Sequence, residues 1–153
     1  MKNGMIVQID KEFLPIFRRH RWYFNRIHGY FSTLTKILSG VNEILYMHNL
    51  VMGKKSGFDT DHINGDKLDN RKKNLRFCTR SQNLMNKTSM VGTSKYKGVR
   101  LKRGKWESNI SIDGKKRHLG YFDSEEDAAH MYNMCAALHF GEFARLNDIE
   151  PCI

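Results

Sequence analysis

The sequence predicts an α+β protein with two small domains, residues 1–86 and 95–153, joined by a linker at residues 87–94. The length of 153 residues allows one ordinary domain or two small ones. Short apolar runs of strand length, separated by glycine turns, occur in both halves, and a helical pattern closes each half. The stretch between the halves is rich in small and polar residues, which is typical of a linker.

Residues 1–47 predict short strands around one helix. Met5–Asp10 alternates between apolar and polar residues as a strand does, and Lys11–His20 is predicted to be helical. Trp22–Phe24 and Tyr30–Leu34 are predicted strands, joined by a turn that contains Gly29. No constellation of catalytic residue types occurs here, so we expect this part to build the sheet against which a site packs.

Residues 61–86 predict a hairpin followed by a helix. Asn64-Gly65-Asp66 is a turn signal, because glycine readily adopts the positive φ that a tight turn requires. Leu75–Cys78 is the predicted returning strand, and Thr79 is the predicted N-cap of the helix. We expect this strand–turn–strand–helix unit to bring together three side chains that are separated in sequence: Asp61, His62 and Asn83.

The same segment carries the residue types that metal-assisted cleavage of a phosphodiester requires. Such a reaction needs a group that takes a proton from water, and oxygen ligands that hold a hard divalent cation. A carboxylate precedes a histidine at positions 61 and 62, an Asn-Leu pair follows at 74 and 75, and another asparagine stands at 83. With Met47–Met52 before it, this pattern resembles the HNH endonuclease family, especially its homing-endonuclease variant, over residues 46–86.

The resemblance implies roles for four residues. His62 would be the general base that activates water, Asp61 and Asn83 would be metal ligands, and Asn74 would hold the hairpin and orient His62. One carboxylate and one amide oxygen favour Mg²⁺, with Mn²⁺ as a second possibility, over Zn²⁺. The resemblance also implies single-metal hydrolysis that leaves 5′ phosphate and 3′ hydroxyl ends. For His48, a packing role and a contact with the scissile phosphate are both open.

The charge of the chain indicates a polyanionic partner. A formal net charge of +10 and a pI near 9.7 favour nucleic acid first and an acidic membrane surface second. Residues 67–105 hold thirteen Lys or Arg and one acid, whereas the rest of the chain is close to neutral. A membrane surface would require a basic amphipathic helix, and the basic stretch instead contains turns and strand-like runs. We therefore expect double-stranded DNA as the partner.

Residues 95–153 predict three antiparallel strands packed on one helix. The strands are Tyr96–Lys102, Lys105–Asp113 and Lys116–Phe122, and the helix runs from about Ser124 to Gly141. The core face of the sheet is assigned Trp106, Ile110 and Leu119, and the packed face of the helix Ala128, Tyr132, Cys135, Ala136 and His139.

This third of the chain resembles the APETALA2-type, or ethylene-response-factor, DNA-binding domain over residues 95–147. The motifs Tyr96–Arg100, Gly104–Trp106, Leu119–Phe122 and Ala144–Asn147 carry the resemblance. It implies a polar sheet face that enters the major groove and contacts guanine edges and phosphates. The residues on that face would be Lys97, Arg100, Lys102, Arg103, Lys105, Asn109, Ser111, Lys116 and His118.

The whole chain is thus predicted to be a metal-dependent DNA endonuclease of the homing type, encoded by a phage or another mobile element and acting in the host cytoplasm. The three cysteines form no Cys-x-x-Cys pair, which disfavours a cysteine zinc site and favours a reducing compartment. No apolar run approaches the roughly 20 residues of a membrane span. We expect a monomer or weak dimer with no protein partner. Two other functions stay open: a DNA-binding regulator on an inactive HNH scaffold, and an RNA-binding module, which the lack of an aromatic stacking platform disfavours.

Overall fold

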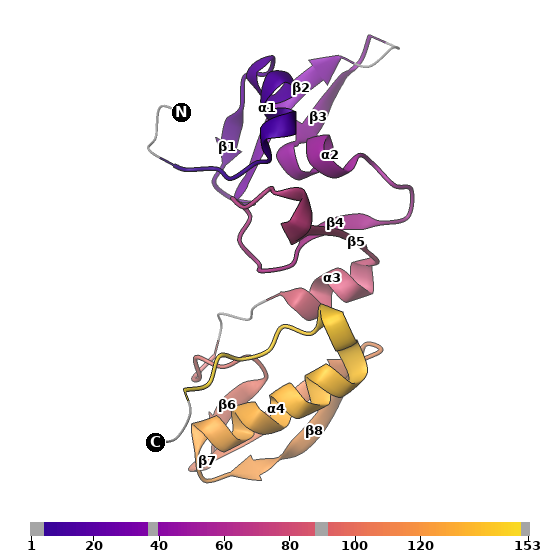
Figure 1. The fold of residues 1–153 in the computed structure, drawn as a ribbon. Helices are drawn as coiled ribbons and strands as arrows, with labels where there is room; N and C mark the ends of the chain where they lie inside the picture. The colour runs from indigo at the N-terminus through magenta and orange to yellow at the C-terminus, as the bar shows by residue number, and fades with distance from the viewer. Residues whose placement is uncertain (1–4, 37–39, 88–91, 151–153) are drawn as a thin grey trace. The chain divides into compact units, whose positions relative to one another are not determined.

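The computed structural model describes residues 5–36, 40–87 and 92–150 (Figure 1). It is a mixed α/β protein with small antiparallel sheets and helices, and it divides into two compact units, Met1–Arg80 and Ser81–Ile153. The division falls at the start of helix α3 (Arg80–Asn86). The exact domain boundaries expected from the sequence stay a prediction.

The first unit opens with a short helical segment and a three-stranded antiparallel sheet of order β1-β2-β3. The segment consists of η1 (Lys11–Phe13) and α1 (Leu14–Arg18), and the strands are β1 (Tyr23–Asn25), β2 (Tyr30–Lys36) and β3 (Asn42–Tyr46). Pro15 lies in the first turn of α1, where its missing N–H leaves no helical bond unmade. Phe31 and Thr33 alternate as the buried residues of β2, so this sheet buries one face.

Two expectations for this unit were wrong or incomplete. Met5–Asp10 is not a strand, because only Gln8 forms a bridge, and its partner is Asp69 in a loop. The amide of Gln8 donates to the carbonyl of Leu68 at 2.9 Å, and the amide of Asn70 donates to the carbonyl of Gln8 at 2.8 Å. Strand β3 was not predicted, since its sequence does not alternate between apolar and polar residues.

A two-stranded antiparallel hairpin carries the motif residues. Strand β4 (Asp59–His62) pairs with β5 (Leu75–Cys78), and the register places His62 opposite Leu75. Helix α2 (Met47–Met52) packs against both strands. The connection between the strands ends in the short helix η2 (Lys72–Asn74).

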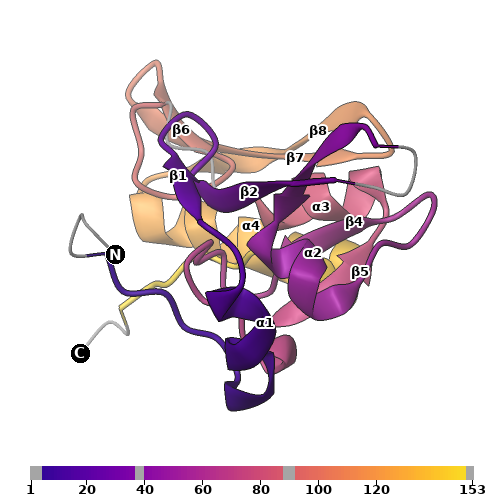
Figure 2. The ribbon, with the colours of Figure 1, turned by 90° about the horizontal axis from the view of Figure 1, so that it is seen from above.

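The second unit is a three-stranded antiparallel sheet, of order β6-β7-β8, with a helix against one face. The strands are β6 (Val99–Lys102), β7 (Lys105–Ile112) and β8 (Lys115–Phe122), followed by α4 (Glu125–Phe140) and η3 (Gly141–Phe143). Both views show α4 along the sheet (Figures 1 and 2), and it packs on all three strands. The hydroxyl of Ser124 accepts a hydrogen bond from the amide of Asp127 at 3.0 Å, so Ser124 caps α4 as expected.

The core of this unit follows the predicted faces, with two differences. Trp106 packs on the cluster around Tyr96, and Ile110 and Leu119 belong to the cluster around Tyr132, as the core-face assignment required. On α4, however, His139 is exposed and Phe140 is buried in its place. Phe140 continues the four-residue spacing from Tyr132 through Ala136, and this spacing keeps side chains on one helix face.

The first predicted strand begins late because of Gly98. Gly98 has φ +79°, and the strand starts only at Val99, while the ring of Tyr96 enters the core. A Cβ at Gly98 would lie 2.1 Å from Cδ2 of Tyr132 and 2.6 Å from the carbonyl oxygen of Asn109. The backbone therefore approaches the core too closely for any side chain at this position.

We predict that Gly98→Ala destabilises the protein by on the order of 3 kcal/mol, because it combines a positive φ with overpacking against a buried ring. Gly104→Ala is the matched control: Gly104 has φ +77°, but a Cβ there meets no atom within 4 Å. Strain alone should cost Gly104→Ala about 1 kcal/mol. Urea unfolding of both variants measures the difference, and equal losses would contradict the close approach at Gly98.

Candidate functional site

Asp61 and His62 lie at the end of β4, and both side chains are buried, with 7% and 3% of their surface exposed. The negative charge of Asp61 acts on the imidazole of His62 and on the hydroxyl of Tyr30. The ring of Tyr30 stacks on that of His62, with 5.9 Å between centroids. The carboxylate of Asp61 and the imidazole of His62 therefore lie close together, beside Tyr30.

Asn70 determines how the His62 ring is held. Its side-chain nitrogen donates to the carbonyl of Lys67 at 3.3 Å, which turns its oxygen toward His62, where Oδ1 lies 3.3 Å from Nε2. Since an amide oxygen can only accept, Nε2 must carry the proton, and the lone pair of the neutral ring is on Nδ1. Burial lowers the pKa of His62, so the ring is neutral near pH 7. Asn70 itself is 1% exposed, so this arrangement is enclosed by protein.

Asn74 fastens the two ends of the β4–β5 connection. Its side-chain oxygen accepts from the amide of Asn64 at 3.1 Å, and its nitrogen donates to Oδ1 of Asn64 at 2.9 Å and to the carbonyl of Asp69 at 2.8 Å. Its carbonyl accepts from the amide of Ile63 at 2.9 Å. Asn74 thus bonds the residues that directly follow His62, and its effect on the orientation of His62 stays a prediction.

Aromatic rings surround His62 on the side of the first sheet. The ring of His48 meets His62 edge-on at 5.4 Å and stacks on Tyr46 at 5.5 Å, while Tyr30 meets His48 edge-on at 5.0 Å. Burial, followed by the charge of His62, lowers the pKa of His48 to about 4. Burial and then the charge of Asp61 raise the pKa of Tyr30. His48 is therefore a neutral packing partner of His62.

Arg76 is the cross-strand partner of Asp61. The register places them opposite each other, and the guanidinium donates to Oδ2 of Asp61 from Nε at 3.0 Å and from Nη2 at 2.9 Å. Both side chains are largely buried, at 12% and 8% exposed. Burial of a carboxylate is costly without an ion-pair partner, so Arg76 offsets the cost of burying Asp61 and fixes its position.

The fourth motif residue lies on the other compact unit. Asn83 is half-buried on α3, within Ser81–Ile153, whereas Asp61 and His62 belong to Met1–Arg80. Its role as a metal ligand stays a prediction.

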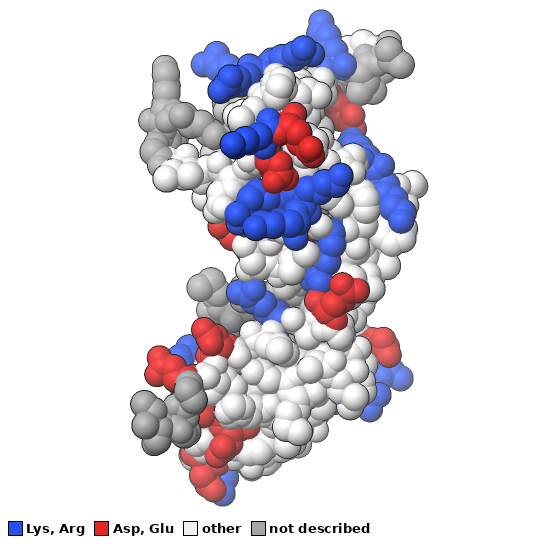
Figure 3. Space-filling model, in the orientation of Figure 1, with Lys and Arg blue, Asp and Glu red and all other residues white. Residues whose placement is uncertain are grey.

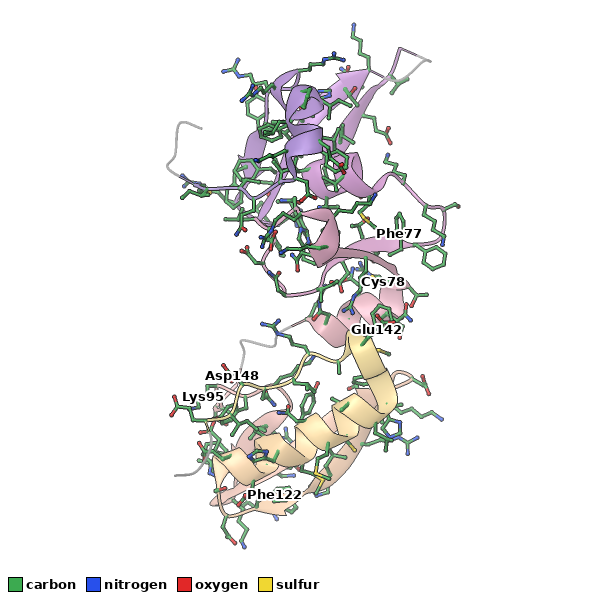
Figure 4. The ribbon with its side chains drawn as sticks, viewed as in Figure 1. Phe77, Cys78, Lys95, Phe122, Glu142 and Asp148 are labelled. Carbon is green, nitrogen blue, oxygen red and sulfur yellow. The ribbon has the colours of Figure 1, made fainter. Side chains whose placement is uncertain are left out.

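Cys78, labelled in Figure 4, ends β5 as a fully buried thiol. Burial raises its pKa to about 11, which makes it a poor ligand and nucleophile.

The predicted DNA-facing residues of the second unit occupy different environments. Arg100, Lys102 and His118 contact the buried carboxylate of Glu107, and Lys105 pairs with Asp123. The ammonium of Lys97 donates to the carbonyl of Met85, and burial lowers its pKa to about 8. Arg103, Ser111 and Lys116 are exposed, and Asn109 is buried at the centre of β7.

The surface view shows where cations gather. Lys and Arg side chains cover the region of the first unit near η2, where Lys72 and Lys73 are exposed (Figure 3). The α4 side of the second unit shows few charges in the same view. Phe122, labelled beneath α4 in Figure 4, packs into the core on this side.

Four residues with direct contacts to predicted site residues were missed from the sequence: Tyr30, Asn70, Arg76 and Glu107. Arg76 could have been found, because the hairpin register that pairs His62 with Leu75 also pairs Asp61 with Arg76. The others have no local signal, since their contacts depend on the path of a loop or on neighbouring strands.

The residues that the structure describes include neither a membrane-spanning helix nor a cluster of metal-ligating side chains. No helix among them is long and apolar enough to cross a membrane. Within the same ranges, no group of three or more His, Cys, Asp and Glu side chains is placed to hold a metal ion.

Comparison with known proteins gives a family match and two similar proteins. The HNH endonuclease family matches residues 47–85, from α2 into α3. A protein of Acanthamoeba polyphaga mimivirus named "Uncharacterized HNH endonuclease L560" is 32% identical over 147 residues, which cover 94% of this chain and 74% of that protein. "Protein 3.8" of Escherichia phage T7 is 34% identical over 92 residues, which cover 58% of this chain and 75% of that protein.

The lowered pKa of His48 predicts a pH-dependent stability. Because the folded ring binds a proton only near pH 4 and the unfolded ring near 6.5, the unfolded state holds more protons between these values. Stability should therefore be complete above about pH 7 and fall as the pH drops, by up to about 1.4 kcal/mol per pH unit for this group. His48→Phe keeps a ring and removes the proton site, so its loss of stability between pH 7 and pH 5 should be smaller. Urea unfolding at both pH values measures this, and identical losses would contradict the assignment.

Proposed function

Since this chain belongs to the HNH endonuclease family and is therefore a DNA-cleaving hydrolase, we propose that it hydrolyses duplex DNA at a recognised site with His62 as the general base. The observation that carries the proposal is the pair of hydrogen bonds made by Asn70, because they hold His62 in one tautomer. Relatives in a mimivirus and a phage fit an enzyme of a mobile element that acts in the host cytoplasm, and we further propose that it is of the homing type.

His62 has the properties that a general base requires. A neutral ring can take a proton from water only through an unprotonated nitrogen, which is Nδ1 when Nε2 donates to Asn70. The proton taken at Nδ1 would give an imidazolium, which the charge of Asp61 stabilises. The rings of Tyr30 and His48 restrict the rotation of His62, so the basic nitrogen keeps one direction.

The donor set fits a hard divalent cation. Asp61 offers a buried, ionised carboxylate fixed by Arg76, and Asn83 offers an amide oxygen at the final position of the motif. We assign these two residues as the ones that would hold the ion, Mg²⁺ or Mn²⁺, with water in the remaining positions. When bound, such an ion neutralises negative charge on the scissile phosphate and the leaving oxygen.

We assign recognition of the duplex to the second unit. Its antiparallel sheet of order β6-β7-β8 carries α4 on one face and, within the described residues, leaves the other face open to a partner, and we propose that this unit acts as an APETALA2-type domain would. Arg103, Lys115 and Lys116 are exposed cations at the turns and strands of this sheet. Tethering this unit to the nuclease would raise the local concentration of the catalytic site at its target.

We predict that His62→Ala lowers the rate of cleavage about 10²- to 10⁴-fold, as expected for loss of a general base, while duplex affinity stays within a factor of three or so. Asn70→Ala should lower the rate about 10- to 100-fold through loss of orientation. Single-turnover cleavage of a supercoiled plasmid gives the rates. Cleavage by His62→Ala within tenfold of wild type would exclude His62 as the base.

A second prediction concerns the cation. Wild-type cleavage should stop in excess chelator, and Asp61→Ala should raise the Mg²⁺ concentration for half-maximal activity at least about tenfold, because it removes a charged ligand. Glu12→Gln, a change at an exposed acid of η1, serves as the control and should titrate as wild type does. A Mg²⁺ titration of plasmid cleavage measures all three proteins. Undiminished wild-type cleavage in chelator would disprove the metal mechanism.

A further inference from the structure

A carboxylate lies at the centre of the sheet face that the proposed function assigns to DNA. Glu107 is on the middle strand, and the register places it between Arg100 on β6 and Tyr121 on β8. Residues opposite each other across an antiparallel sheet share a face, so the three side chains form one row. The Glu107 side chain is 5% exposed, whereas that of Arg100 is 48% exposed.

The row is bound together by hydrogen bonds to Glu107. Arg100 donates from Nε to Oε2 of the carboxylate. Oε1 accepts from the ammonium of Lys102 and from the hydroxyl of Tyr121, both at 3.1 Å. Nδ1 of His118 lies 3.5 Å from the same oxygen. The guanidinium of Arg100 is the main cause that holds the pKa of Glu107 far below its usual range, so the carboxylate is ionised near pH 7.

A carboxylate in this position works against simple phosphate binding. It repels a phosphate, and it already neutralises part of the charge of the cations that surround it. A surface selected only for affinity to the DNA backbone would gain from an uncharged residue at this site. The placement of Glu107 therefore indicates that the cations around it do something other than bind phosphate.

The geometry of Arg100 is suited to contacting the edge of a base. Its Nε is held by Glu107, and among the described residues its two terminal nitrogens make no hydrogen bond. A guanidinium fixed at Nε presents two parallel donors in one plane, which match O6 and N7 of guanine in the major groove. Holding a long side chain in place before binding also reduces the conformational entropy lost on binding.

We propose that Glu107 is a specificity-determining residue, which positions Arg100 to read a guanine edge and keeps backbone phosphates away from the centre of the sheet face. The proposal rests on the assignment of DNA recognition to the second unit. In this role Glu107 contacts Arg100, which contacts the base, and Glu107 need not contact DNA itself. A purely structural ion cluster would contribute to stability and leave sequence preference unchanged.

The experiment uses the full chain and a duplex selected by the wild-type protein from a random-sequence pool. Affinities for this duplex and for a scrambled one are measured at two salt concentrations. For Glu107→Gln we expect the ratio of the two affinities to fall on the order of tenfold, the discrimination that one bidentate contact provides. Most of the fall should come from tighter binding to the scrambled duplex, with a steeper salt dependence, since Arg100 is then able to contact phosphate.

Two controls separate positioning from charge and from stability. Glu150→Gln removes an exposed acid of the same unit, with the same change in net charge, and should leave the ratio unchanged. Tyr121→Phe removes one hydroxyl, which donates to Glu107 and accepts from Lys102, so it should lower the ratio two- to threefold or so without loss of fold. Thermal melting accompanies each variant. If Glu107→Gln does not fold, Tyr121→Phe alone decides the proposal.

The double variant Arg100→Lys with Glu107→Gln shows whether Glu107 acts through Arg100. If it does, the double variant should discriminate no worse than Arg100→Lys alone, because interacting residues are not additive. Additive losses, or an unchanged ratio for Glu107→Gln and Tyr121→Phe in folded protein, would overturn the proposal. Suppose that Lys116→Gln loses affinity for DNA while Glu107→Gln keeps the wild-type ratio of affinities for the selected and scrambled duplexes. The second unit would then still be the DNA-binding unit, but the role of Glu107 would be refuted. If neither Arg100→Lys nor Lys116→Gln changes affinity for any duplex, the proposed function of this unit fails as well.

Discussion

The connection between β4 and β5 is held in shape by hydrogen bonds among its own asparagine and aspartate side chains, and the rest of the site depends on this. Residues 63–74 contain no regular structure until η2, so their backbone groups need other partners. Asn74 closes the two ends, and Asn64 donates to Asp69 at 3.3 Å. The network brings Asn70 to the imidazole of His62. If the connection were less ordered, His62 would still be present, but its imidazole would no longer be held in one orientation.

Several of the cations that give the chain its basic character are already paired. Arg71 makes a two-point contact with Asp69, at 2.7 and 2.6 Å, and Arg76 does the same with one oxygen of Asp61. Glu107 holds Arg100 and Lys102. In each case a nearly buried acid holds the basic side chain in place. The basic group then has a defined position and direction for hydrogen bonding, which an exposed, freely rotating side chain lacks. The total of 26 Lys and Arg therefore overstates the number of cations that can neutralise phosphates, whereas the net charge of +10 already subtracts the acids that pair with them.

The sequence predicted best those features that depend on local spacing. The start of α4 at Ser124 and the core positions Trp106, Ile110 and Leu119 follow from short-range patterns. Features that depend on long-range pairing were missed. Alternation at Met5–Asp10 indicated a strand, but a strand needs a partner strand, and only a loop lies beside this segment. Likewise, no local pattern reveals that neighbours from β6 and β8 cover Glu107. A bulge between Ser108 and Asn109 also shifts the register of β7 against β8.

The bridge between Gln8 and Asp69 has a consequence for the evolution and engineering of this nuclease. Gln8 exchanges two backbone hydrogen bonds with the loop that carries Asn70, and the carboxylate of Asp10 accepts from the amide of Lys72 at 2.7 Å. The working nuclease is therefore larger than the stretch of residues 47–85 by which its family is recognised. A recombination event or an engineered graft that transferred only this stretch would leave the carbonyl of Leu68 and the amide of Asn70 without their partners. Breakpoints that preserve the loop must fall before Gln8.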